Sequence, residues 1–148
     1  MNETEILNKI LNGEKMAVEI IQTYMHHLNE PNLKMTMEQW VDTHQRNADK
    51  IISYLGHQGI DSTNSTGMIG WMANTKAKLN TLFNHEPLDI LHEVYDGEDK
   101  GIERSVQISK ENNLTPEATA LIEEILSNDH THLKQMKRFI TQYERDND

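Results

Sequence analysis

The chain has 148 residues, a formal net charge of −10 at pH 7 and no cysteine. The length predicts one domain over residues 1–148, because it suffices for one hydrophobic core and is short for two typical domains. The negative charge argues against a nucleic-acid partner, and the lack of cysteine excludes disulfides, thiolate zinc sites and cysteine nucleophiles, which leaves carboxylate, imidazole and carbonyl groups as metal ligands.

The spacing of apolar residues predicts an all-α protein. Proline occurs only at positions 31, 87 and 116, and apolar and polar residues never alternate over more than a few positions. Each proline marks an expected helix boundary, as in Thr115-Pro116-Glu117, where an N-cap residue precedes the proline and an acidic first turn follows. We therefore expect four long helices, over residues 4–28, 32–57, 87–112 and 116–144.

The apolar stripe of the first helix, residues 4–28, is interrupted once. The stripe consists of Leu7, Ile10, Leu11, Ala17, Val18, Ile21, Tyr24, Met25 and Leu28. Glu14 stands at the missing position, so we expect its carboxylate to face the core.

The second helix, residues 32–57, has a similar interruption. Apolar residues occupy one face in residues 33–41 and again in residues 48–55, and His44 and Asn47 lie on that face between them. We expect both side chains to point inward.

The segment between the second and third helices, residues 58–86, is much longer than the other connections. A helix of 25 residues is about 38 Å long, so this segment is long enough to run the length of a bundle and make the second and third helices parallel. The apolar residues of its second half have helical spacing and predict a short helix on the bundle. Packing is the simplest role for that stripe of methionine and aromatic residues, rather than ligand binding.

The third and fourth helices repeat the pattern. Glu98 interrupts the stripe of residues 87–112, and Asp129 and His132 interrupt that of residues 116–144. The last two lie three positions apart and therefore face the same way.

An internal repeat relates the two halves of the chain. The segment NGEKMAVE (residues 12–19) matches DGEDKGIE (residues 96–103) at an offset of 84, which pairs Glu14 with Glu98. At an offset of 85, His44 pairs with Asp129 and Asn47 with His132. We therefore expect these polar groups at one level of a pseudo-twofold bundle.

Buried carboxylates and imidazoles need partners, because burying such a group alone costs several kcal/mol. They must satisfy one another, enclose water or hold a cation. The alternative for the glutamates is a hydrogen bond to a core tyrosine such as Tyr24 or Tyr95. The candidate metal ligands are Glu14, His44, Asn47, Glu98, Asp129 and His132.

These features resemble the ferritin-like superfamily over the whole chain. In that family two helices each supply a Glu and the other two each supply a Glu-x-x-His pair around two irons. The dipeptides Gly13-Glu14 and Gly97-Glu98 resemble those of rubrerythrins, and Asp129 with His132 resembles the Glu-x-x-His pair. A less characterised bacterial branch of four-helix proteins is similar too.

The resemblance implies a ferritin-like four-helix bundle that binds iron. Where the family has its other Glu-x-x-His pair, this chain has His44 and Asn47, which could ligate through a ring nitrogen and an amide carbonyl. The three carboxylates suit one ion, or a loosely held second one, better than a tight iron pair. Manganese and zinc remain open as alternatives.

Two functions follow as expectations. The first is iron binding, with oxidation or storage of iron or protection against oxidative damage as its purpose; the alternative is a metal-free helical module for structure or protein interaction. We also expect a homo-oligomer, a dimer or larger. No secretion signal or transmembrane pattern is evident, so we expect a cytoplasmic protein without a membrane partner. No motif of hydrolases or nucleotide-binding loops is present.

Overall fold

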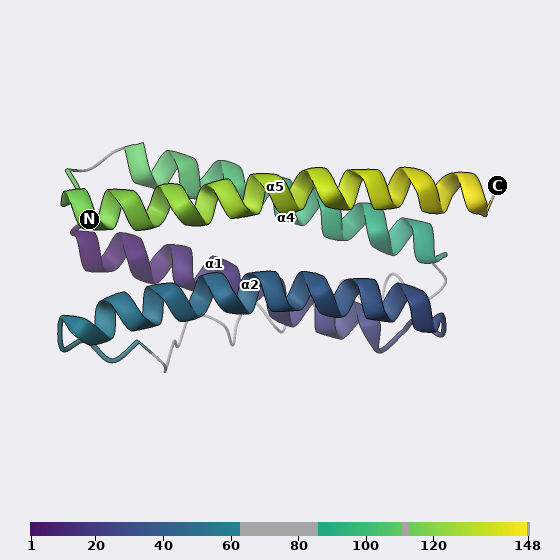
Figure 1. Cartoon of the computed structure of the whole chain (residues 1–148), viewed down its shortest axis with the longest axis horizontal. Coiled ribbons are helices and arrows are strands. Elements are labelled where there is room, and N and C mark those ends of the chain that lie inside the picture. Colours follow the sequence, from purple (N-terminus) through teal and green to yellow (C-terminus); the bar gives the residue numbers. More distant parts are fainter. Residues whose placement is uncertain (63–85, 111–112, 148) are drawn as a thin grey trace.

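A computed structural model describes residues 1–62, 86–110 and 113–147, and within these ranges it contains helices and no strand. Four helices, α1 (Glu3–Met25), α2 (Pro31–His57), α4 (Pro87–Lys110) and α5 (Pro116–Asp146), lie side by side in a bundle (Figure 1). The all-α four-helix prediction is confirmed. The short helix expected in the second half of the connection lies outside the described residues.

Most helix boundaries agree with the predicted ones, but α1 ends at Met25 rather than at residue 28. The residues after Met25 form turns, with hydrogen bonds that include one of 3.1 Å from the Leu28 amide to the Met25 carbonyl. Glu30 then takes an extended conformation, as the residue before a proline must, and Pro31 begins α2. Leu28 is nevertheless buried, so its place in the apolar stripe did not require it to be helical.

The start of α5 is fixed by a cap that also reaches α1. The Thr115 hydroxyl accepts a hydrogen bond of 3.3 Å from the Ala118 amide, and Pro116 occupies the first turn. The Thr115 amide and hydroxyl donate to Glu3 Oε1 at 2.8 and 2.7 Å. These bonds lower the pKa of the Glu3 carboxyl, which burial alone would raise. The beginnings of α1 and α5 therefore lie together.

The helices form two parallel pairs. In Figure 1, α1 and α5 run in one direction and α2 and α4 run in the other. At the far end of the bundle the Tyr143 hydroxyl of α5 donates to Glu30, next to the start of α2, at 2.8 and 3.0 Å. The predicted parallel arrangement of the second and third long helices is confirmed.

Each helix buries one stripe, and none of the described helices has an apolar stretch long enough to cross a membrane. The buried residues form two apolar clusters. One surrounds Met37, Trp40 and Leu91, and the other surrounds Leu11 and Ile51. Between them lies a polar layer, to which every helix contributes at the interruption of its stripe. The layer consists of Glu14, His44, Asn47, Glu98, Asp129 and His132, none of which is more than 8% exposed.

Candidate metal centre

His44 lies at the centre of the polar layer and contacts carboxylates from two other helices. Its Nδ1 is 2.5 Å from Glu14 Oε2 on α1, and its Nε2 makes a short contact with Glu98 Oε1 on α4. Both repeat-related glutamates therefore meet one imidazole, one at each ring nitrogen. The tyrosines considered as alternative partners, Tyr24 and Tyr95, lie in or against the apolar cluster around Met37 instead.

The charges at these contacts stabilise one another. Burial alone would lower the pKa of His44, but the Glu98 and Glu14 carboxylates outweigh it and hold that pKa well above the usual value. Burial likewise would raise the pKa of Glu98, but the neighbouring His44 and His132 lower it to about 2. In the metal-free protein His44 is therefore an imidazolium that donates to two carboxylates.

Asp129 differs from the two glutamates in its protonation. Its Oδ1 lies 3.8 Å from His44 Nδ1, too far for a hydrogen bond. Burial, together with the adjacent Glu14 carboxylate, raises the pKa of Asp129 to about 9. At neutral pH the proton of Asp129 relieves the repulsion between neighbouring acids.

Asn47 connects the acids of α1 and α5. Its Nδ2 donates to Asp129 Oδ1 at 2.9 Å and is 3.4 Å from Glu14 Oε1. Its carbonyl accepts a hydrogen bond of 3.2 Å from Asn128 Nδ2. The carbonyl expected to act as a metal ligand is therefore engaged in a hydrogen bond. Sequence reasoning missed Asn128, which is polar at the border of the core stripe, because its position does not distinguish it from a surface residue.

His132 is buried, and its Nε2 makes no hydrogen bond to any described residue. This nitrogen lies 3.6 Å from Glu98 Oε1. The ring packs edge to face against His44, with centroids 5.1 Å apart, and against Trp40, at 6.0 Å. A buried nitrogen that makes no hydrogen bond and lies near a carboxylate is an available metal ligand.

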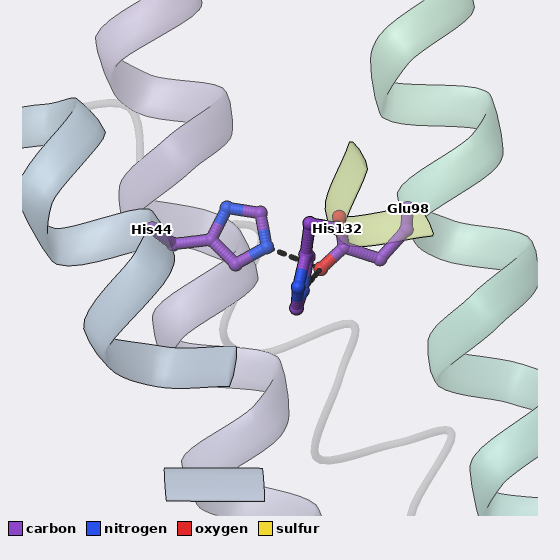
Figure 2. Close-up of side chains that lie close together, drawn as sticks. All are labelled: His44, Glu98 and His132. Carbon is purple, nitrogen blue, oxygen red and sulfur yellow. Dashed lines mark hydrogen bonds and ion pairs between the residues drawn. The ribbon is translucent and has the colours of Figure 1, made fainter. Parts of the chain in front are cut away.

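Two sets of side chains could hold a metal ion. The first comprises His44, Glu98 and His132, and the second comprises Glu14, His44 and Asp129; in each set the ligand atoms lie within 4.8 Å of one another. Figure 2 shows the members of the first set converging from α2, α4 and α5. Five of the six predicted ligands are thus brought together, and the sixth, Asn47, lies beside them as a hydrogen-bond donor.

The first set fits a transition metal by its chemistry. Two imidazole nitrogens and one carboxylate oxygen form a donor combination that non-haem iron proteins use and that zinc also accepts. Such a cation would bind the His132 nitrogen that makes no hydrogen bond and would balance the charge of the Glu98 carboxylate.

Comparison with known proteins identifies a family without a known role. A family model described as a domain of unknown function (DUF2383) matches residues 2–111, and the chain belongs to this family. The matched region includes α1, α2 and α4, with Glu14, His44 and Glu98, and ends before α5. No curated protein and no solved structure matches the chain.

Proposed function

We propose that this member of the DUF2383 family is a metal-binding protein whose bundle core holds a divalent transition metal through His44, Glu98 and His132. The observation that carries the proposal is the buried His132 Nε2, which has no hydrogen-bond partner among the described residues and faces Glu98. A helical bundle that needed only packing here would be more stable with an apolar residue at this position.

His44 is already oriented for ligation by its other nitrogen. Metal-binding histidines commonly donate the second ring N–H to a carboxylate, which fixes the tautomer and the ring direction. In this role Glu14 accepts from His44 Nδ1, and the proton on Nε2 leaves when the nitrogen becomes a ligand. Metal binding is therefore expected to release protons and to strengthen as pH rises.

Iron is the metal that we propose, with manganese and zinc as competitors. Two imidazoles and one carboxylate, with further coordination positions open, are the donor set of non-haem iron(II) sites, and manganese and zinc accept the same donor types. Bound iron would supply one-electron chemistry toward oxygen or peroxide. A ferritin-like role in iron oxidation, storage or protection from oxidative damage follows from this proposal, supported by the parallel α2 and α4 and by the mid-bundle position of the acids and imidazoles.

Metal analysis of protein purified from iron-supplemented cells tests the proposal. We expect close to one equivalent in the wild type and an affinity about 10- to 100-fold lower in His132→Gln. His130→Gln is the matched control, because His130 is exposed on the same helix. It should bind like the wild type. A wild type with less than about a tenth of an equivalent, and no uptake of added Fe²⁺, Mn²⁺ or Zn²⁺, would contradict the proposal.

A metal-free structural or interaction module is the second candidate. It is favoured by the His44 imidazolium, which already pairs with both Glu14 and Glu98. Thermal unfolding separates the two functions, because an ion that binds only the folded state must raise the melting temperature. A melting temperature unchanged by Fe²⁺, Mn²⁺ and Zn²⁺ would support the module.

A further inference from the structure

The Asn47 amide lies beside the second set of possible ligands, Glu14, His44 and Asp129. A second cation bound there would need free carboxylate oxygens, but the amide hydrogen-bonds to two of them. Glu14, His44 and Asp129 bring ligand atoms within 4.8 Å of one another and would by chemistry alone attract a cation. Asn47 Nδ2, however, donates to Asp129 Oδ1 at 2.9 Å and lies 3.4 Å from Glu14 Oε1. The hydrogens of this amide point at carboxylate oxygens from two helices.

An amide nitrogen cannot ligate a cation, since it carries hydrogens and has no free lone pair. Asn47 would have to turn its carbonyl toward the acids to become a ligand. In that orientation it would lose the hydrogen bond that its carbonyl accepts from Asn128 at 3.2 Å and the bonds that its nitrogen donates to the two acids, and it would direct its oxygen at the Glu14 carboxylate. Asn47 is only 1% exposed, so water is poorly placed to replace these bonds.

The internal repeat shows how the two halves of the centre differ. At the offset of 85, Asn47 occupies the position that His132 occupies in the second half. His132 directs toward Glu98 a nitrogen that makes no hydrogen bond, whereas Asn47 directs hydrogens toward Glu14. The half of the layer around Glu98 therefore has a nitrogen that can bind a metal ion, His132 Nε2. The half around Glu14 has instead an amide N–H group, which cannot bind one.

We propose that Asn47 restricts the centre to a single metal ion, held by His44, Glu98 and His132, because its amide nitrogen hydrogen-bonds to both Glu14 and Asp129. This inference rests on the proposed function, because it concerns the number of ions that the same centre takes. Asn47 is then a positioning residue that sets metal stoichiometry without touching the ion.

The test is a count of Mn²⁺ ions bound per chain by equilibrium dialysis and metal analysis, with electron paramagnetic resonance to detect two neighbouring ions. We compare the wild type, Asn47→Asp, which replaces the donor by a carboxylate, and Asn47→Ser, which removes the bridging amide without adding charge. Asn32→Asp is the matched control, because it adds the same charge to an exposed position of α2. Circular dichroism with and without Mn²⁺ checks that each variant is folded.

We expect one ion in the wild type and in Asn32→Asp, and two spin-coupled ions in Asn47→Asp. Any weak second binding in the wild type at high Mn²⁺ should be about 10- to 100-fold weaker than the second site of Asn47→Asp. Asn47→Ser should bind a second ion less tightly than Asn47→Asp does. If Asn47→Asp does not fold, the number of ions bound by Asn47→Ser tests the inference. Two tightly bound ions in the wild type, or one ion in every folded Asn47 variant, would overturn the inference and leave the proposed function intact. No ion in the wild type would instead overturn the proposed function.

Discussion

His132 is the residue at which a structural and a metal-binding role predict opposite results. Its Nε2 has no hydrogen-bond partner among the residues described, and its one favourable polar interaction is with the Glu98 carboxylate at 3.6 Å, so leucine of similar size should lower the stability of the metal-free protein by only about 1–2 kcal/mol. His44→Leu is the contrasting variant, because it leaves Glu14 and Glu98 buried without their partner and should cost about 3–5 kcal/mol. Urea unfolding with a chelator present measures both, and equal losses would assign His132 a structural role.

The protonation of the polar layer predicts an unusual pH dependence. Asp129, with its pKa raised to about 9, and His44, with its pKa well above the usual value, both hold protons in the folded state that the unfolded chain gives up. Their contributions to the free energy of unfolding are complete at low pH and decline as the pH rises. For each of these two protons the decline is at most about 1.4 kcal/mol per pH unit. Glu98, with a pKa lowered to about 2, loses its contribution only below the usual range of glutamate.

The metal-free protein should therefore be less stable at pH 8 than at pH 5.5, as measured by urea midpoints in chelator. Asp129→Asn keeps the shape of the protonated acid and removes its titration, so it should flatten this dependence. The metal-loaded protein should show a weaker decline or the opposite trend, because its ligands are already deprotonated. An identical decline in the wild type and in Asp129→Asn would refute the assigned protonation.

At the residue scale, the interruptions of the apolar stripes were enough to predict the six polar side chains of the described helices that face the core. All six are buried. The pairings were not predictable, because stripe phase gives the direction of a side chain but not its neighbour across the bundle. Nothing in the sequence showed that His44 would meet both Glu14 and Glu98, or that the Asn47 amide would point its nitrogen at the acids.

At the element scale, two glycines precede the glutamates of the repeat inside continuous helices. Gly13 in α1 and Gly97 in α4 are exposed, neither has a positive φ, and an added Cβ would meet nothing within 4 Å at either position. Alanine at each should therefore raise the free energy of unfolding by about 0.5–1 kcal/mol, because it is the better helix former. Chemical denaturation tests this, and metal content should stay unchanged. Loss of metal in Gly97→Ala would show that the helix must deform there to bind it.

The cap at Thr115 links two helices as well as starting one. Thr115→Ala removes the hydroxyl that caps α5 and donates to Glu3, and should lower the free energy of unfolding by about 1–2 kcal/mol. Thr141→Ala serves as the control, because the Thr141 hydroxyl is exposed and donates only to the Lys137 carbonyl one turn earlier. Equal losses of stability in the two variants would show that the cap and its bond to Glu3 add no stability beyond that of an ordinary surface threonine.

The sequence predicted the starts of three helices more accurately than the end of α1. Pro31, Pro87 and Pro116 each begin a helix, because a missing amide hydrogen costs nothing in the first turn. The end of α1 carries no such mark. Leu28 continues the apolar spacing and is buried, yet it belongs to the turn that follows Met25, so periodicity alone extended the helix too far.

At the scale of the whole molecule, the direction of the helices determines which acids can meet. α2 and α4 run parallel, as do α1 and α5 (Figure 1). The mid-helix interruptions of all four helices lie at one level, because their side chains contact one another. The length of the connection between α2 and α4 was enough to predict this arrangement. Whether the layer holds an ion was not predictable, since the same six side chains can also form a hydrogen-bonded network.

The most direct test of the account is a crystal structure of the protein loaded with Fe²⁺ without oxygen, with anomalous diffraction data collected at the iron edge. The account predicts one anomalous peak in the core, within bonding distance of His44 Nε2, Glu98 and His132 Nε2, and no peak between Glu14 and Asp129. A core without a peak, with His44 still between the two glutamates, would contradict the metal-binding function.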